Sequence, residues 1–249
     1  MLLLIIMIIT SENNNDFVLQ LQEDYPGRVI AYTTIEEEDE NSLEVFRKTV
    51  DEGSQGLKLI GWHGAYIRQY NISLIDEKMY ELYEFSEENE LPIVDHIRMS
   101  ESGEYYQDLT KILSDFPNLK IILAHGGLDL NNLKKLDLLL EENPNLYIDL
   151  SFYGTYYKYW FKQVGKHYYD FRNLIIKYPD QVLWATDLYP STDRGYDYMV
   201  SAIDCSVKLF EELSFKCPGF EDNETLTGLN LPPKVLKKIY YDNAVELLN

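Results

Sequence analysis

The stretch of sequence that decides the fold is FPNLKIILAHGG, residues 116–127. A Pro-Asn turn leads into a short apolar run, and this run ends at His125, which two glycines follow. An apolar run of strand length that is bounded by turn residues is typical of a buried strand in a parallel sheet. The pattern therefore predicts a strand that carries an imidazole at its carboxyl end.

Two other segments have the same form. The run LPIVDH, residues 91–96, ends at His96, and the run QVLWATD, residues 181–187, ends at Asp187. Ligand sites of parallel α/β sheets lie at the carboxyl ends of the strands. Three strands that each end at a metal-ligand type of residue therefore predict one polar site at one edge of the sheet.

Strand-like and helix-like segments alternate along the whole chain, which predicts βαβ units and a parallel sheet. No glycine-rich phosphate loop follows a strand, which disfavours nucleotide binding. The predicted fold is α/β, a (β/α)8 TIM-barrel-like single domain over residues 1–249. The seven strand candidates are residues 2–9, 28–33, 56–60, 92–96, 120–125, 146–150 and 181–186. The helix candidates are 13–25, 40–52, 76–90, 105–116, 130–142, 166–178, 194–213 and 232–248, and residues 216–231 read as a loop.

Composition limits the classes of partner. The 249 residues include 42 acidic and 22 basic side chains, so the net charge is -20. Such a surface should repel nucleic acid and anionic membranes, and a small-molecule substrate is the expected partner. Cys205 and Cys217 lack the spacing of a metal site. A disulfide between them is one alternative, but free thiols in a reducing cytoplasm are expected.

The three strand-end residues have chemical roles that fit one another. The neutral imidazole of His96 is a good ligand for zinc or a similar divalent ion, although a hydrogen-bonded core histidine is the alternative. Glycines after His125 allow the backbone and a ligand to approach closely. A carboxylate such as Asp187 is costly to bury unless it is paired or metal-bound, but it could also cap a helix. Their joint position at strand ends favours a functional site.

Other residues near the same strand ends are candidates for binding substrate. Lys58 is a charged residue within an apolar strand, so it either extends outward to solvent or points into the barrel mouth. Trp62 and His63 follow in a glycine-flanked loop, and Arg98 lies two residues after His96. The aromatic segment 152–161 reads as a loop that forms a lid or a subunit contact, or that simply packs.

The motifs together identify a family. The chain resembles the amidohydrolase superfamily, in the amidohydrolase-related branch of aminocarboxymuconate-semialdehyde decarboxylase-like enzymes. The motifs that carry the resemblance are GLKL (56–59), LPIVDH (91–96), FPNLKIILAHGG (116–127), NLYIDLS (145–151), VLWATD (182–187) and DNA (242–244). The resemblance implies a distorted barrel, a homodimer and one divalent metal, usually zinc, with manganese as an alternative. It also implies that His96 binds metal, that His125 polarises substrate or helps to activate water, and that Asp187 binds metal and transfers protons.

The chain departs from the family at the first strand. The family's first strand carries a His-x-His pair of metal ligands, whereas the histidines of this chain are His63, His96, His125 and His167. Together with the seven strands, this predicts a barrel that lacks its first strand, as written here. We expect a metal-dependent hydrolase of a small-molecule amide, lactone or ester. The alternatives are a metal-dependent non-oxidative decarboxylase of an aromatic or unsaturated acid, and a non-catalytic degenerate barrel.

Overall fold

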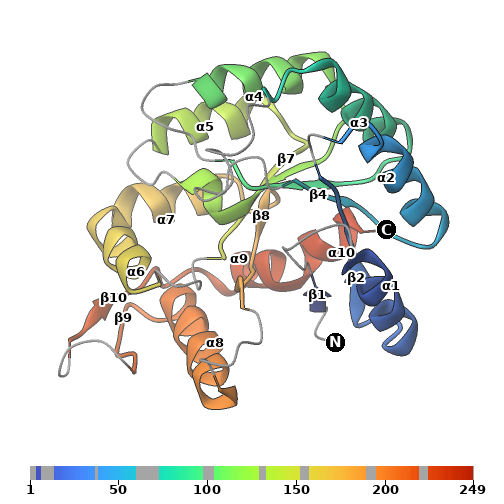
Figure 1. Ribbon diagram of the computed structural model, residues 1–249. Helices are drawn as coiled ribbons and strands as arrows, with labels where there is room; N and C mark the ends of the chain where they lie inside the picture. Colours follow the sequence, from blue (N-terminus) through green and yellow to red (C-terminus); the bar gives the residue numbers. More distant parts are fainter. Residues whose placement is uncertain are drawn as a thin grey trace. The chain divides into compact units, whose positions relative to one another are not determined.

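A computed structural model describes residues 4–6, 14–36, 39–59, 73–97, 104–128, 133–151, 157–188, 195–218 and 224–248. Strands and helices alternate through most of these ranges (Figure 1). The strands are β1 (Leu4–Ile6), β2 (Val29–Ala31), β3 (Thr33–Thr34), β4 (Leu57–Leu59), β5 (Ile93–Asp95), β6 (Ile121–Leu123), β7 (Leu146–Asp149), β8 (Val182–Leu183), β9 (Ser214–Phe215) and β10 (Leu226–Thr227). The helices are α1 (Asn15–Asp24), α2 (Ser42–Asp51), α3 (Glu77–Glu88), α4 (Glu104–Asp115), α5 (Leu133–Glu142), α6 (Tyr157–Lys166), α7 (Tyr168–Lys177), α8 (Tyr196–Glu211), α9 (Pro233–Lys237) and α10 (Asn243–Leu247).

The strands form the parallel sheet that the sequence predicts. Six of them are hydrogen-bonded in the order β3-β4-β5-β6-β7-β8, and β1 pairs in parallel with β2. Each of the seven predicted strand segments contains an observed strand. The second predicted segment is divided at Tyr32, because β2 pairs with β1 whereas β3 pairs with β4. The α/β class and the parallel strand order are thus confirmed.

The chain divides into two compact units. The first contains residues 1–128, 143–147 and 247–249, and the second contains residues 129–142 and 148–246. In the first unit, the rings of Phe46 on α2 and Phe85 on α3 meet edge to face, with centroids 5.2 Å apart. Helices α2 and α3 therefore pack side by side (Figure 1).

Hydrogen bonds and strand register define the two faces of the sheet in the first unit. The Thr33 hydroxyl contacts the hydroxyl of Thr49 on α2 at 2.5 Å, so the face that bears Thr33 is covered by helix. Thr33 pairs in register with Leu57, and Thr34 pairs with Lys58. Because successive side chains of a strand point to opposite faces, Lys58 lies on the face away from α2. We call this the inner face.

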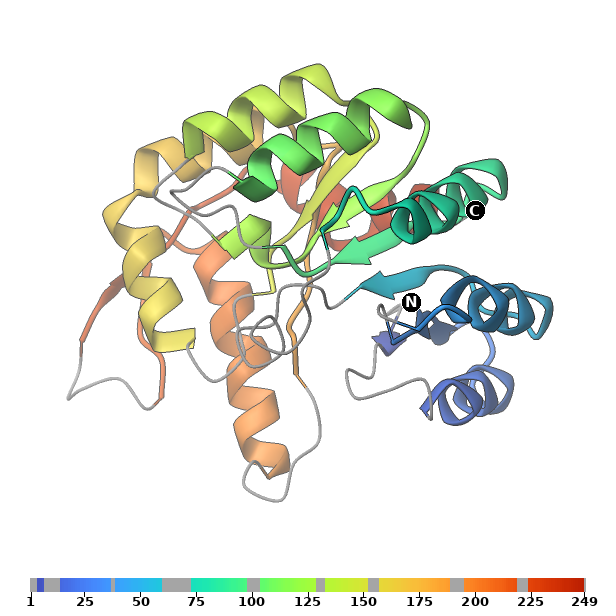
Figure 2. The same ribbon diagram turned by 45° about the horizontal axis from the view of Figure 1, so that its top comes forward.

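In the second unit, the terminal helical segment is attached to β8. The buried Asn243 side-chain amide donates hydrogen bonds to the carbonyl oxygens of Pro179 and Val182, each at 2.7 Å. Helix α7 is tied to α5 by an ion pair between Lys177 and Asp137 at 2.9 Å. Helix α6 lies against the small antiparallel hairpin of β9 and β10 (Figures 1 and 2).

Three predictions about local structure are corrected. The aromatic segment 152–161 is helical from Tyr157 onward, and residues 152–156 lie outside the described residues. The predicted loop 216–231 contains β10, which pairs with β9 in a hairpin. The predicted terminal helix is interrupted by a π turn, η4 (Lys238–Asp242), between α9 and α10.

The expectation of free thiols is wrong in this structure, because Cys205 and Cys217 form a disulfide. Their Cα atoms are 5.7 Å apart, within the range that a disulfide spans. The fold brings them together because the chain reverses direction between α8 and β9. Within the described ranges, no helix is both long and apolar enough to cross a membrane.

Candidate active site

Two predicted site residues meet in the first unit. The rings of His96 and His125 lie edge to face, with centroids 5.0 Å apart and planes at 82°. His96 follows β5, and its backbone N–H donates to the Leu59 oxygen at 3.2 Å, which extends the ladder past the end of the strand. Both imidazoles are half-buried. The structure therefore brings together two of the three strand ends from which the sequence predicts a site.

The backbone at His125 explains how its ring reaches His96. Strand alternation would place His125 on the same face as Ile121 and Leu123, opposite the inner face on which Val94 and His96 lie. Instead, residues 124–128 form a turn, η2 (Ala124–Leu128), in which His125 has a φ of 55°. Gly126 and Gly127 continue the left-handed backbone with φ values of 61° and 73°. The two glycines thus permit the turn that aims the imidazole.

Asp187 has the same unusual backbone in the second unit. Its φ is 54°, and it lies four residues beyond the end of β8. A left-handed conformation costs a residue with a side chain about 1–2 kcal/mol and concentrates at functional sites. The two other non-glycine residues with positive φ in the described ranges are Glu90, beyond the end of α3, and Asn230, a type that tolerates this conformation. His and Asp are also enriched in this conformation, but His125 and Asp187 are the two of these four residues that lie just beyond strands of the parallel sheet.

Lys58 is buried, which rules out the predicted extension to solvent. Only 3% of its surface is exposed, and its register partners on the inner face are Thr34 and Val94. His96 lies two residues after Val94 and therefore on the same inner face. The structure thus places a buried ammonium group and the His96 imidazole on one face of the first unit.

Tyr32 also belongs to the inner face, and its ring lies against Gly56. Burial raises the pKa of the Tyr32 hydroxyl well above its usual range, so this group remains a neutral phenol.

Two buried carboxylates lie at strand ends. Asp95 is on the opposite face of the sheet and pairs in register with Leu59. Asp149 is engaged locally, since it accepts a hydrogen bond from the Ser151 backbone N–H at 3.0 Å.

The predicted substrate-binding residues Trp62, His63 and Arg98 lie outside the described residues. Trp184 was not singled out in the sequence analysis. Its backbone N–H and its indole N–H both donate hydrogen bonds, to Ile239 and to Ser206. Asn243 appeared only as part of a motif, although its side-chain amide donates to a carbonyl group within β8 and to another before this strand. A polar residue on the apolar side of a terminal helix is the signal that could have identified it.

The donor types fit a divalent metal, but the number of grouped ligands falls short. Imidazole nitrogen is a good donor for zinc and for related ions, and the structure brings two imidazoles together. Within the described residues, no group of three or more His, Cys, Asp or Glu side chains could hold a metal ion. A catalytic zinc usually has three protein ligands. The histidine pair therefore supplies part of a ligand set.

A family model described as amidohydrolase matches residues 5–249. The chain belongs to this family. The match runs through every strand and helix described above, so the family assignment covers both compact units. A search of curated proteins found no match.

Solved structures show the same barrel fold at low sequence identity. An uncharacterised TIM-barrel protein from Bordetella bronchiseptica has a TM-score of 0.61 and 18% identity, with 94% of this chain and 71% of that chain covered. A 5-carboxyvanillate decarboxylase from Sphingomonas paucimobilis has a TM-score of 0.59 and 17% identity, with 99% and 78% covered. A "probable 2-pyrone-4,6-dicarboxylic acid hydrolase" from Acinetobacter baumannii has a TM-score of 0.62 and 14% identity, with 99% and 82% covered. The chain therefore has a TIM-barrel-like α/β fold.

Proposed function

We propose that this amidohydrolase-family chain is a metal-dependent hydrolase that cleaves an amide, lactone or ester bond in a small molecule. The observation that carries the proposal is the contact between the His96 and His125 rings at the ends of two parallel strands. Membership of the amidohydrolase family supports it. A bound divalent ion would lower the pKa of a water molecule and would polarise the carbonyl group of the substrate.

We assign the other steps of the reaction to side chains of this chain. We assign His96 and Asp187 as metal ligands, zinc being the expected ion and manganese the alternative. His125 would donate an N–H to the oxygen on which negative charge develops. Asp187 would accept a proton from the attacking water and return it to the leaving group. His125 and Asp187 share a left-handed backbone, a conformation that concentrates at functional sites, and this supports their assignment.

Substrate binding is assigned to Lys58, Trp62, His63 and Arg98. The burial of Lys58 supports its part in this set, because a buried ammonium group interacts with an anion far more strongly than an exposed one does. The assignment of Trp62, His63 and Arg98 is supported only by their positions in the sequence.

The burial of Lys58 also favours a second candidate, metal-dependent decarboxylation of an aromatic or unsaturated acid. An ammonium group on the same face as His96 suits a substrate that carries a carboxylate. One protein of similar fold is a decarboxylase and another is named as a hydrolase, so the barrel itself is compatible with either reaction.

The purified chain, loaded with zinc or manganese, should hydrolyse at least one member of a panel of small lactones, esters and amides. Hydrolysis of lactones and esters is followed as proton release in weakly buffered solution, and hydrolysis of amides is followed as released amine. The same panel includes aromatic acids whose decarboxylation is followed as carbon dioxide. Chelation of the metal should abolish turnover. Carbon dioxide without any hydrolysis would favour the second candidate. A folded chain that binds no metal and turns over nothing would be the non-catalytic barrel.

A further inference from the structure

Trp184 is held in place by two hydrogen bonds and a ring contact, and it lies shortly before Asp187 in the chain. Its backbone N–H donates to the Ile239 oxygen at 2.8 Å, and its indole Nε1 donates to the Ser206 hydroxyl at 3.0 Å. Its ring meets the Tyr240 ring at right angles, with centroids 5.7 Å apart. Only two residues separate Trp184 from Asp187. The direction in which the Asp187 segment leaves the sheet is therefore set at Trp184.

The π turn η4 contributes one half of this anchorage. A π turn widens the helix and leaves a carbonyl group without its ordinary partner, and such turns are frequent at functional sites. Ile239 and Tyr240 both lie in this turn, and they provide the carbonyl acceptor and the aromatic contact for Trp184.

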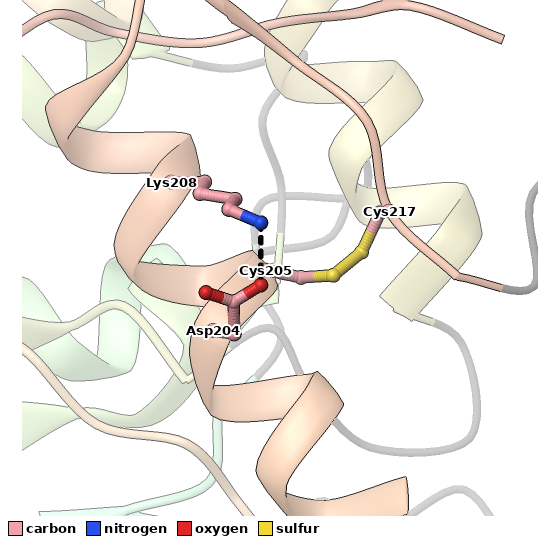
Figure 3. The surroundings of a disulfide bond; sticks show 4 residues. All are labelled: Asp204, Cys205, Lys208 and Cys217. Atoms are coloured by element: carbon pink, nitrogen blue, oxygen red, sulfur yellow. Dashed lines mark hydrogen bonds and ion pairs between the residues drawn. A yellow bond between two sulfur atoms is a disulfide. The ribbon is translucent and has the colours of Figure 1, made fainter. Parts of the chain in front are cut away.

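The hydrogen bond of the Trp184 indole is accepted by Ser206 on α8, the residue next to the disulfide. Ser206 is buried and directly follows Cys205, which is cross-linked to Cys217 (Figure 3). The cross-link ties the middle of α8 to the segment after β9, so it limits rotation and sliding of the helix at Ser206. The cysteine surfaces are 1% exposed for Cys205 and 8% exposed for Cys217.

Other bonds keep α8 in place when the cross-link is absent. The backbone N–H groups of Leu229 and Leu231 donate to the oxygens of Leu209 and Phe210 at 2.7 and 2.9 Å. The end of α8 therefore stays attached to the chain after β10. Loss of the disulfide should loosen the helix near Ser206 without unfolding the second unit.

We propose that the Cys205–Cys217 disulfide is a redox-sensitive brace that positions Asp187 through Ser206 and Trp184. This inference rests on the proposed function, because it takes Asp187 as the residue that transfers protons.

The reductant that opens the disulfide is a dithiol. Its first thiolate attacks the Cys217 sulfur, the more exposed of the two, and releases the Cys205 thiolate, which takes up a proton. Its second thiolate then displaces Cys217, so the dithiol becomes a disulfide and the protein gains two thiols.

The experiment follows the Trp184 indole and the activity in the same samples. Oxidised chain is compared with chain that has been reduced by dithiothreitol, freed of reagent under nitrogen and reloaded with metal, and with the Cys205→Ser/Cys217→Ser variant. The Trp184→Phe variant identifies the indole N–H signal in nitrogen-15 spectra. We expect hydrogen exchange of this indole to become about tenfold faster in both cross-link-free forms, the order that one weakened hydrogen bond gives. We expect kcat to fall by a similar factor with little change in KM.

Two further variants separate the brace from general damage. Ser206→Ala should accelerate indole exchange in the oxidised chain and should make kcat insensitive to the dithiol. Lys208→Ala breaks an exposed ion pair with Asp204 that lies beside the disulfide (Figure 3), and it should leave the indole unchanged. Equal indole exchange in oxidised and reduced chains would overturn the brace. Faster exchange with an unchanged kcat would overturn its link to Asp187. Faster exchange in a chain that is inactive in every form would support the brace and contradict the proposed function.

Discussion

Replacement of Asp187 by Asn should lower kcat by about a thousandfold, within the range that a positioned proton-transfer group contributes. The change keeps the shape of the side chain, and Asn tolerates the left-handed backbone that Asp187 adopts with φ of 54°. It removes the negative charge and the proton acceptor. In the metal-free chain, the free energy of unfolding should therefore change by about 0.5 kcal/mol or less.

Asp51→Asn is the matched control for this experiment. Asp51 is exposed at the end of α2, so the substitution removes the same charge from a helix and not from the carboxyl end of a strand. Its kcat should equal that of the unmodified chain. If Asp187→Asn retains more than half of the activity, Asp187 transfers no proton and the proposed mechanism is wrong.

Gly56→Ala is the substitution with the largest expected effect on stability. A Cβ atom at this position would lie 2.3 Å from Cε1 of Tyr32 and 2.7 Å from the Pro92 oxygen. Tyr32 is 2% exposed and cannot swing into solvent, and the Pro92 oxygen accepts the Leu57 N–H that joins β4 to β5. We expect a loss of about 3 kcal/mol in the free energy of unfolding, at the upper end for overpacking.

Gly165→Ala provides the comparison at a glycine with space. Gly165 lies within α6, and a Cβ atom there would meet only the Thr227 Cβ at 3.7 Å. Alanine should stabilise this helix by about 0.5–1 kcal/mol, because glycine loses more freedom on folding. Chemical denaturation measures both variants. If Gly56→Ala proves as stable as the unmodified chain, the inner face has more room than the structure shows, and the position assigned to Tyr32 is wrong.

Sequence patterns were sufficient for the seven predicted strand segments and for the meeting of His96 with His125, but not for the β9–β10 hairpin. The seven segments are apolar runs of strand length, and β5 and β6 are neighbours both in the chain and in the sheet. Parallel neighbours place their carboxyl ends together, so the contact of the two imidazoles follows from strand order. The left-handed turn at His125 was indicated only by the two glycines that follow it.

Other features depend on tertiary structure and could not be read from the sequence. Whether Lys58 is buried depends on the register of β3, β4 and β5, since a shift by one residue would move it to the helix-covered face. Helix α6 was missed because it begins with aromatic residues, whose helix propensity is weak. The disulfide was missed because a separation of 12 residues says nothing about distance in space.

Metal content of the purified chain tests the central claim most directly, namely that His96 belongs to a metal centre. Elemental mass spectrometry should find about one zinc or manganese ion per chain, the number for a mononuclear site. His96→Ala should lose the ion, whereas His167→Ala should keep it, because His167 lies at the N-cap of α7 and not at the end of a strand. A folded chain without bound metal, or a His96→Ala variant that retains it, would contradict the account.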